Sequence, residues 1–203
     1  MSVTDRLVVE KLRAALGACC IGREIIVLEE TKSTNDRVLE LALEGAKEGV
    51  VVFAERQTAG RGQHGNRWES AAGHGLWFSM LLRPRIPLRD SVRLTTWLAQ
   101  AVAATITQTT GLEATVKLPN DIYIAEQKIA GVLVEMRAMP QADHAAIAGI
   151  GVNVNQTAED FSPKIRDRAG SLRLALGQPV ERHDLAIALL KNLDATYRET
   201  FAP

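Results

Sequence analysis

The spacing of apolar side chains divides the chain into predicted strands and helices. Short runs rich in β-branched and aromatic residues predict strands, whereas apolar positions repeated every three or four residues predict helices. The strand-like runs cover residues 24–28, 50–55, 76–82, 114–117, 122–124, 128–136 and 145–154. The helical patterns cover 5–20, 91–109 and 185–201, together with a helix that begins near Ser33 and ends near Gly45 or Gly49. Everything after residue 154 is expected to be largely helical.

The order of these elements favours an α+β fold. Several strands follow one another between helices, and 122–124 and 128–136 suit a hairpin through the turn-like sequence AEQ. This order predicts one mixed, largely antiparallel sheet with helices packed on it, and disfavours a doubly wound parallel sheet. The sequence shows no repeat, low-complexity tract or linker. We therefore expect a single domain over 1–203, in which 1–21 form an N-terminal helical extension.

Composition and charge exclude several classes of protein. Apolar residues make up 46% of the chain, while 24 basic residues balance 24 acidic ones. Zero net charge disfavours bulk binding of DNA or of anionic membranes. The apolar runs are far shorter than the roughly 20 residues of a membrane span, and residues 1–10 have no apolar signal region. The adjacent Cys19 and Cys20 fit neither a disulfide nor a zinc cage. We expect a cytoplasmic protein.

A glycine-rich segment at 56–75 is the first candidate for chemistry. It contains GRGQHG at 60–65, which formally matches the G-x-G-x-x-G of dinucleotide-binding folds. That interpretation requires a helix opening within the motif, and the following NRWESAAGHG has no helical period. A mobile surface loop is the plain alternative. However, a loop that combines arginines, backbone amides and a tryptophan is suited to wrapping a planar, anionic ligand such as a nucleoside phosphate.

Four segments in order resemble one enzyme family. They are KSTND at 32–36, AERQTAGRGQHGNRW at 54–68, KLPNDIYIAEQKIAGVLVE at 117–135 and GIGVNVN at 149–155. Together they resemble the catalytic domain of biotin protein ligases, also called biotin–acetyl-CoA-carboxylase ligases, over roughly residues 22–200. The resemblance implies the biotin ligase catalytic fold, which is like that of class II aminoacyl-tRNA synthetases.

The resemblance also implies a two-step reaction with biotin and ATP as substrates. The biotin carboxylate attacks the α-phosphate of ATP, which gives biotinyl-5′-AMP and pyrophosphate. A lysine of the biotin carboxyl carrier domain of acetyl-CoA carboxylase, or of a related carboxylase, then takes the biotinyl group and releases AMP. Mg²⁺ is expected mainly on the ATP phosphates, with no protein ligands identified. No DNA or membrane partner is implied, and a homodimer is left open.

Residue roles follow from the same resemblance. Lys117 and Arg61 are the expected catalytic residues, with Lys117 meeting the biotin carboxylate and the α-phosphate. The expected biotin-binding residues are Ser33, Thr34, Asn35, Gln57, Arg61, Gly62, Gln63 and Lys117. The expected nucleotide-binding residues are Gly60, Gly62, Gln63, Trp68, Asn120, Lys128, Gly131 and Asn153.

Several of these residues could instead have a purely structural role. Ser33 and Thr34 are good helix N-caps, and Trp68 could be a core anchor. A lysine at a strand end, such as Lys117, is usually only solvated. Asn153 could be a buried asparagine whose hydrogen bonds are satisfied within the protein.

Two positions depart from the family pattern. Gln63 stands where the family usually has a second loop arginine, which would contact the acyl phosphate, so retention of the adenylate is in doubt. Leu118 replaces the usual tryptophan of the lysine–tryptophan–proline turn, and an apolar packing role is expected to survive. Only 32 residues precede Ser33, too few for the helix-turn-helix domain of repressor members, and the SH3-like module that often follows the helix at 185–201 is expected to be absent.

Other functions remain as alternatives. A lipoate or octanoate ligase or transferase would share the fold, although the arginine- and glycine-rich loop typical of those ligases does not occur here. A degenerate biotin binder without catalysis is kept open by Gln63.

Overall fold

One seven-stranded sheet forms the centre of the structure, a computed structural model that describes residues 6–139 and 142–201. The strand order is β1-β2-β3-β7-β6-β5-β4, in which β1 and β2 are parallel and every other neighbouring pair is antiparallel. The strands are β1 (Glu24–Thr31), β2 (Val50–Gln57), β3 (Gly75–Leu82), β4 (Ala114–Lys117), β5 (Asp121–Ile124), β6 (Gln127–Met139) and β7 (Ala142–Asn153). The mixed, largely antiparallel α+β fold predicted from the sequence is confirmed.

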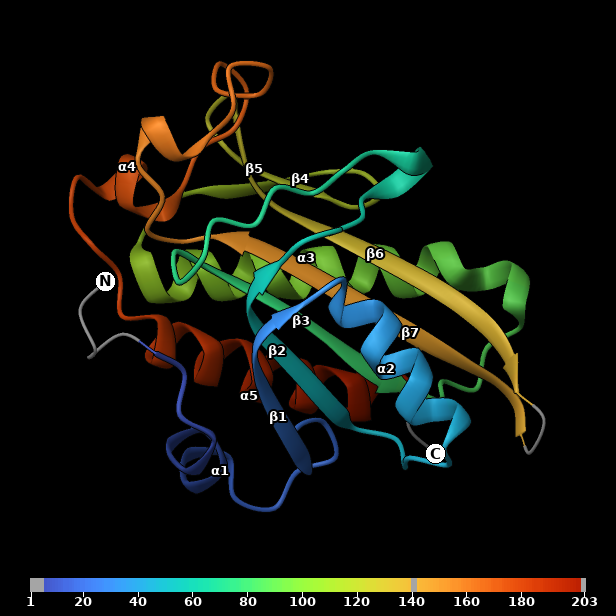
Figure 1. Cartoon of the computed structure of the whole chain (residues 1–203). Helices are drawn as coiled ribbons and strands as arrows, with labels where there is room; N and C mark the ends of the chain where they lie inside the picture. Colours follow the sequence, from blue (N-terminus) through green and yellow to red (C-terminus); the bar gives the residue numbers. More distant parts are fainter. Residues whose placement is uncertain (1–5, 140–141, 202–203) are drawn as a thin grey trace.

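Helices cover both faces of this sheet. The long helices α3 (Ser91–Thr110) and α5 (Arg182–Thr200) pack against each other on one face, and α1 (Val9–Leu16) contacts α5 and β1. Figure 1 shows α2 (Thr34–Leu43) on the near face, where it packs on β2, β3 and β7. Two apolar clusters result. The larger one lies between the sheet and α3 and α5, and the smaller one lies under α2.

Strand β2 shows why the apolar pattern predicted strands well. Val51 and Phe53 join the larger cluster, while Val50 and Val52 join the cluster under α2. Successive strand residues point to opposite faces, so a strand covered on both sides is continuously apolar. The sequence VVVFA at 50–54 is such a run.

The first predicted helix is shorter than expected. The prediction covered 5–20, of which residue 5 lies outside the described residues, whereas α1 spans Val9–Leu16. Its start is displaced because the backbone N–H of Leu7 donates to the Glu55 carboxylate at 3.0 Å and that of Val8 donates to His183. Gly17 ends the helix with a φ of 65°, a left-handed value that glycine adopts readily.

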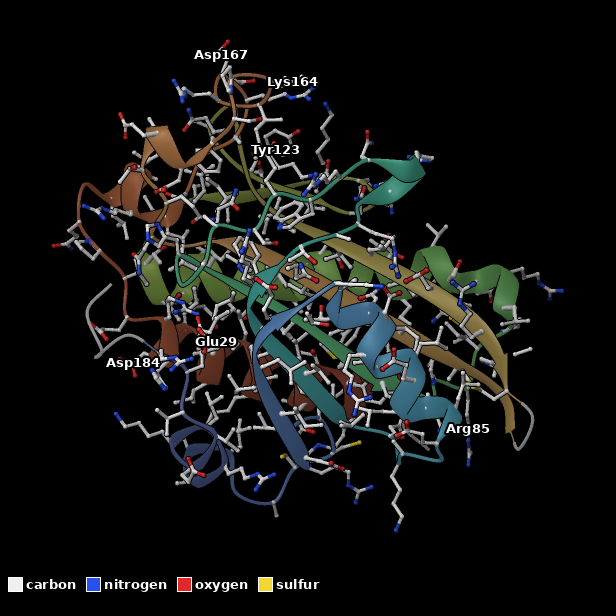
Figure 2. The ribbon with its side chains drawn as sticks, in the orientation of Figure 1. Glu29, Arg85, Tyr123, Lys164, Asp167 and Asp184 are labelled. Atoms are coloured by element: carbon white, nitrogen blue, oxygen red, sulfur yellow. The ribbon has the colours of Figure 1, made fainter. Side chains whose placement is uncertain are left out.

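The region after β7 is less helical than predicted. Residues 154–171 form an irregular segment with one short 3₁₀ turn, η4 (Ala158–Asp160), followed by α4 (Leu172–Leu176). Backbone hydrogen bonds from Lys128 N to Arg168 O and from Gly170 N to Lys128 O hold this segment against β6. Figure 2 shows Tyr123 of β5 at the same end of the molecule as Lys164 and Asp167 of this segment.

Within the described residues, no helix has the length and apolar character that crossing a bilayer requires.

Candidate functional site

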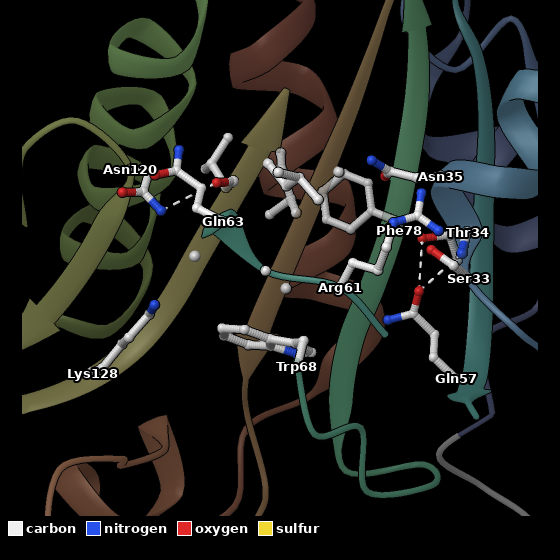
Figure 3. Close-up of a pocket in the computed structure, with 17 residues that line it drawn as sticks. Ser33, Thr34, Asn35, Gln57, Arg61, Gln63, Trp68, Phe78, Asn120 and Lys128 are labelled. Carbon is white, nitrogen blue, oxygen red and sulfur yellow. Dashed lines mark hydrogen bonds between the residues drawn. The ribbon is translucent and has the colours of Figure 1, made fainter. Parts of the chain in front are cut away.

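A polar cavity opens where the N-terminus of α2 meets the end of β2 and the glycine-rich loop. It is open to solvent. Figure 3 shows Ser33, Thr34 and Gln57 on one side of it and Asn120 and Lys128 on the other. We call it the first cavity. Its walls are Ser33, Thr34, Asn35, Gln57, Arg61, Gly62, Gln63, Trp68, Phe78, Asn120, Lys128, Gly131, Val132, Leu133, Gly149, Ile150 and Gly151.

A chain of hydrogen bonds fixes the polar end of this cavity. Gln57 Oε1 accepts from the Thr34 backbone N–H at 2.9 Å. The Thr34 and Ser79 hydroxyl oxygens lie 2.6 Å apart, and Ser79 donates to Asn35 Oδ1 at 2.6 Å. Because Thr34, Asn35 and Ser79 are buried, these bonds hold their side chains in fixed orientations. The wall can therefore present preset donors and acceptors to a polar ring.

Ser33 has the backbone position of a helix N-cap without the usual capping bond. Its φ and ψ of −153° and 137° are those of the residue that precedes a helix, and its side chain makes no capping hydrogen bond. The side chain is buried and lines the first cavity. Its hydroxyl is therefore placed to serve a ligand in the cavity.

Arg61 lies at the mouth of the cavity within an ion-pair network. Its guanidinium contacts Asp36 at 2.6 Å and Glu135 at 3.0 Å, and Glu135 also accepts from Asn35 at 2.7 Å. Burial would raise the pKa of Glu135, but hydrogen bonds from Asn35 and Arg61 outweigh it and the pKa is lowered. Burial would lower the pKa of Arg61, but its bonds to Asp36 and Glu135 raise it. Both groups stay charged, and they tie the loop to α2 and β6.

The glycine-rich loop is folded as a hairpin. A β-bridge joins Arg61 to Arg67, and Gly62 N donates to Asn66 O at 2.7 Å. The element after Gly62 is a single 3₁₀ turn, η2 (Gln63–Gly65), which agrees with rejecting the dinucleotide-binding motif. Trp68 N donates to Gly60 O, and a Cβ on Gly60 would lie 2.7 Å from Trp68 O. Gly60 therefore has a structural role at the base of the hairpin, and it does not line either cavity.

Trp68 lies on a floor made of two glycines. Gly131 of β6 and Gly151 of β7 are direct neighbours across the sheet. A Cβ built on Gly151 would lie 2.6 Å from the Trp68 ring, and one on Gly131 would lie 3.0 Å from it. The ring also packs edge-on against Trp77 at a centroid distance of 6.0 Å. A side chain at Gly151 would therefore clash with the ring, and one at Gly131 would crowd it.

A second cavity of about 300 Å³ adjoins the first one and shares two residues with it, Trp68 and Lys128. Its remaining walls come from the loop, from β5 and β7, and from the irregular segment after β7. They are Asn66, Arg67, Glu69, Asp121, Tyr123, Asn153, Phe161, Ile165, Arg168 and Ala169. Apolar and aromatic side chains together with cations suit a nucleotide, which has a flat base and charged phosphates.

Lys128 stands at the junction of the two cavities. Its ammonium lies 2.6 Å from Asp121 Oδ1 and 5.5 Å from the centre of the Trp68 ring. Its backbone is held on both sides by the segment 168–170. Lys128 therefore contributes a fixed cation to the walls of both cavities.

Two side-chain contacts join the loop to the segment that walls the second cavity. His74 lies 3.1 Å from Asp160, and Ser162 donates to Glu69 through its backbone and its hydroxyl. Burial would raise the pKa of Asp160, but hydrogen bonds from Thr157 and the charge of His74 lower it.

The structure brings most of the predicted site residues together. The first cavity is lined by eleven of them: Ser33, Thr34, Asn35, Gln57, Arg61, Gly62, Gln63, Trp68, Asn120, Lys128 and Gly131. Asn153 lines the second cavity, but its amide is also satisfied internally by Gly170 O and Gln156. The internally satisfied asparagine is therefore confirmed, and the nucleotide-binding role stays a prediction.

Lys117 lies outside both cavities, and its expected catalytic role receives no support from the structure. Its side chain is exposed, and its ammonium is 5.7 Å from the centre of the Tyr123 ring. It lies opposite Asp121 in the β4–β5 register, yet Lys128 makes the ion pair with that carboxylate. The expected packing role of Leu118 is wrong, because this side chain is 67% exposed.

Several residues that line the cavities were not predicted from the sequence. Phe78, Leu133, Gly149 and Gly151 line the first cavity, and Tyr123, Phe161, Ile165 and Arg168 line the second. The alternating glycines of GIG at 149–151 were an available signal. They leave one face of a strand without side chains, and a Cβ on Gly149 would lie 2.2 Å from Asn35 Oδ1. The irregular segment gave no comparable signal.

Comparison with known proteins agrees with these features. The model of a family described as the biotin/lipoate A/B protein ligase family matches residues 27–155. The bifunctional ligase/repressor BirA of Bacillus subtilis is 38% identical over 189 residues, and the biotin–[acetyl-CoA-carboxylase] ligase of Mycobacterium tuberculosis is 33% identical over 188. These matches cover 93% and 89% of this chain, but 58% and 66% of those proteins.

A solved structure gives the same result. The biotin protein ligase of Aquifex aeolicus in complex with biotin and ATP superimposes with a TM-score of 0.73 and 32% sequence identity. The match covers 89% of this chain and 74% of that one.

Proposed function

Since this chain belongs to the biotin/lipoate A/B protein ligase family, we propose that it is an ATP-dependent biotin ligase. The observation that carries the proposal is the pair of adjoining cavities that share Lys128 and Trp68. One cavity is small and has preset polar groups, and the other combines aromatic side chains with cations. Biotin in the first and ATP in the second would bring a carboxylate and an α-phosphate together at Lys128.

In the first step, a biotin carboxylate oxygen attacks the α-phosphorus, and the bond to pyrophosphate breaks. This step brings several negative charges together, and a fixed cation lowers its barrier most when it is aimed at the developing charge. Lys128 takes the role that the sequence analysis gave to Lys117, because its ammonium faces both cavities. Arg61 is held at the mouth by Asp36 and Glu135 and adds a second cation.

In the second step, the ε-amine of an acceptor lysine attacks the acyl carbon of biotinyl-AMP. The bond from that carbon to the phosphate oxygen breaks, AMP leaves with the electron pair, and the attacking nitrogen loses a proton to solvent as the amide forms. The acceptor is proposed to be the biotin carboxyl carrier domain of a carboxylase. ATP as co-substrate would place the reaction in the cytoplasm.

Mg²⁺ is proposed to arrive with ATP. Across 6–139 and 142–201, no three His, Cys, Asp or Glu side chains lie together in a way that would hold a metal ion. Asp121, the carboxylate nearest to Lys128, is already engaged by that ammonium and by Asn120. We therefore assign no protein ligand to the ion, whose contribution is to offset the charge of the phosphates.

Pyrophosphate release tests the proposed function. Protein, MgATP and biotin should release pyrophosphate. A purified carrier domain added afterwards should release AMP and gain the mass of one biotinyl group on a lysine, measured by mass spectrometry. No release with biotin but turnover with lipoate would move the chain to the lipoate branch of the family. Tight biotin binding without pyrophosphate release would leave a biotin binder without catalysis.

Gln63 gives a prediction about retention of the intermediate. It lines the first cavity, at the position where the resemblance to the family implies a second loop arginine. A charged donor on an acyl phosphate contributes more than a neutral amide, by about 1–2 kcal/mol, or about tenfold in rate. Gln63→Arg should therefore slow the dissociation of biotinyl-AMP by about tenfold. Dissociation can be followed by rapid filtration with labelled biotin. Equal rates in the two proteins would show that position 63 does not control retention.

A further inference from the structure

One arginine, Arg61, lines the first cavity, and two carboxylates already hold it. Its Nη1 donates to Asp36 at 2.6 Å, and its Nη2 donates to Glu135 at 3.0 Å. Neither carboxylate lines the cavity, so only the guanidinium of this group faces a ligand there. An anionic ligand that enters the cavity must therefore share, or take over, a cation that is already paired.

Glu135 is held firmly in this network. Besides Arg61, its carboxylate accepts from Asn35 at 2.7 Å and from Arg137 at 2.8 Å, and its side chain is 19% exposed. A carboxylate that is partly buried and has three donors loses much free energy when it is separated from them. We expect Glu135 to keep these contacts when a ligand binds, and thereby to hold Asn35 in the wall of the cavity.

Asp36 is held much less firmly. Within 6–139 and 142–201, Arg61 is its one ion-pair partner, and the two side chains are 43% and 39% exposed. Exposed ion pairs of this kind contribute little to stability. Asp36 also lies in the first turn of α2, where the partial positive charge of the helix N-terminus favours a carboxylate even without Arg61. Separating Asp36 from Arg61 therefore requires little free energy.

We infer that Asp36 is a displaceable counter-ion, whose place on Arg61 is taken by the carboxylate of the ligand while Glu135 keeps the guanidinium in position. The inference rests on the proposed function, because it takes the ligand of the first cavity to be a carboxylic acid. Biotin, with its carboxylate, and biotinyl-AMP, with its phosphate, can both replace Asp36. The biotinyl group of the protein product is a neutral amide and cannot, so Asp36 returns to Arg61. The exchange thus favours the acid and its adenylate over the amide product.

The binding of an acid and of its amide separates this role from a structural one. Asp36→Asn keeps the size and the hydrogen-bond acceptor of the side chain but removes the competing charge. It should bind biotin about fivefold more tightly, the scale expected of one charge a few ångströms away in a partly solvated site. It should bind biotinamide, the neutral amide, within about twofold of the original chain, because that ligand carries no charge for Asp36 to oppose. Asp36→Glu, which keeps the charge, should retain the original affinity for both ligands. Isothermal titration calorimetry without ATP measures these affinities.

Glu40→Gln is the matched control on the same helix. Glu40 also pairs with an arginine, Arg37 at 2.9 Å, and its side chain is 59% exposed, so the variant loses one negative charge of α2 without a contact to Arg61. It should leave both affinities unchanged.

Weaker or unchanged binding of biotin by Asp36→Asn would overturn the counter-ion role, because a carboxylate that only positions the loop gives no gain when its charge is removed. An equal change for biotin and biotinamide would overturn it too, as would an equal gain in Glu40→Gln. Failure of the original chain to bind biotin would instead remove the proposed function itself.

Discussion

Replacing Lys128 by alanine is expected to slow the formation of biotinyl-AMP by about two to three orders of magnitude, the usual effect of removing one preset donor from developing charge. The substitution removes the cation shared by the two cavities. It also leaves the Asp121 carboxylate, now 2.6 Å from that ammonium, without its partner beside an anionic nucleotide. Both effects act in the same direction. Single-turnover pyrophosphate release measures them without any contribution from the acceptor.

Lys117→Ala is the matched control for this prediction. Lys117 is an exposed lysine at the end of β4, which β5 separates from the strand of Lys128, and it lies outside both cavities. Its rate of adenylate formation should stay within about threefold of the original, the scale of an exposed charge that is screened by solvent. The reverse result, with Lys117→Ala inactive and Lys128→Ala active, would restore the role that the sequence patterns suggested for Lys117.

The two lysines show where sequence patterns stop being informative. Both belong to the segment 117–135 that resembles the family, and a motif gives the order of residues but not the direction of side chains. In the structure, the β5–β6 register shifts between Ile122 and Tyr123. Such an irregularity re-aims the side chains beside it. Lys128 then reaches Asp121 although it is paired with Tyr123 in the ladder. No spacing rule predicts that shift.

Local patterns predicted the sheet because each strand satisfies them on its own. A run such as VVVFA at 50–54 is apolar throughout since helices cover both faces of the sheet. The first helix and the segment 154–171 depend instead on distant partners. Leu7 is drawn to Glu55, and residues 168–170 are held by Lys128. Contacts of this kind override local preference. The segment held by Lys128 forms a wall of the second cavity, and local patterns did not predict it for that reason.

The largest effect on stability is expected at a buried ion pair that includes Glu55, the residue that Leu7 contacts. Glu55 and Arg182 are 3% and 1% exposed and lie 2.7 Å apart. Arg182 also donates to Gly73 O at 3.1 Å and to Gly75 O at 3.0 Å, where the glycine-rich loop rejoins the sheet. Glu55 accepts in addition from Leu7 N. One pair therefore fixes α5, β2, the loop and the segment before α1.

Glu55→Gln should lower the free energy of unfolding by about 3–5 kcal/mol, because it keeps the shape of the side chain but removes the carboxylate charge that lies 2.7 Å from the buried Arg182 guanidinium. The melting temperature should fall by roughly 10 °C.

Glu30→Gln is a matched control on the adjacent strand β1. Glu30 also pairs with an arginine, Arg56 at 2.9 Å, but the two side chains are 50% and 56% exposed, so its loss should cost less than about 1 kcal/mol. Urea unfolding of both variants compares them. Equal stability of the two would mean that water reaches Arg182 as readily as it reaches Arg56, and that the Glu55–Arg182 pair does not anchor the loop.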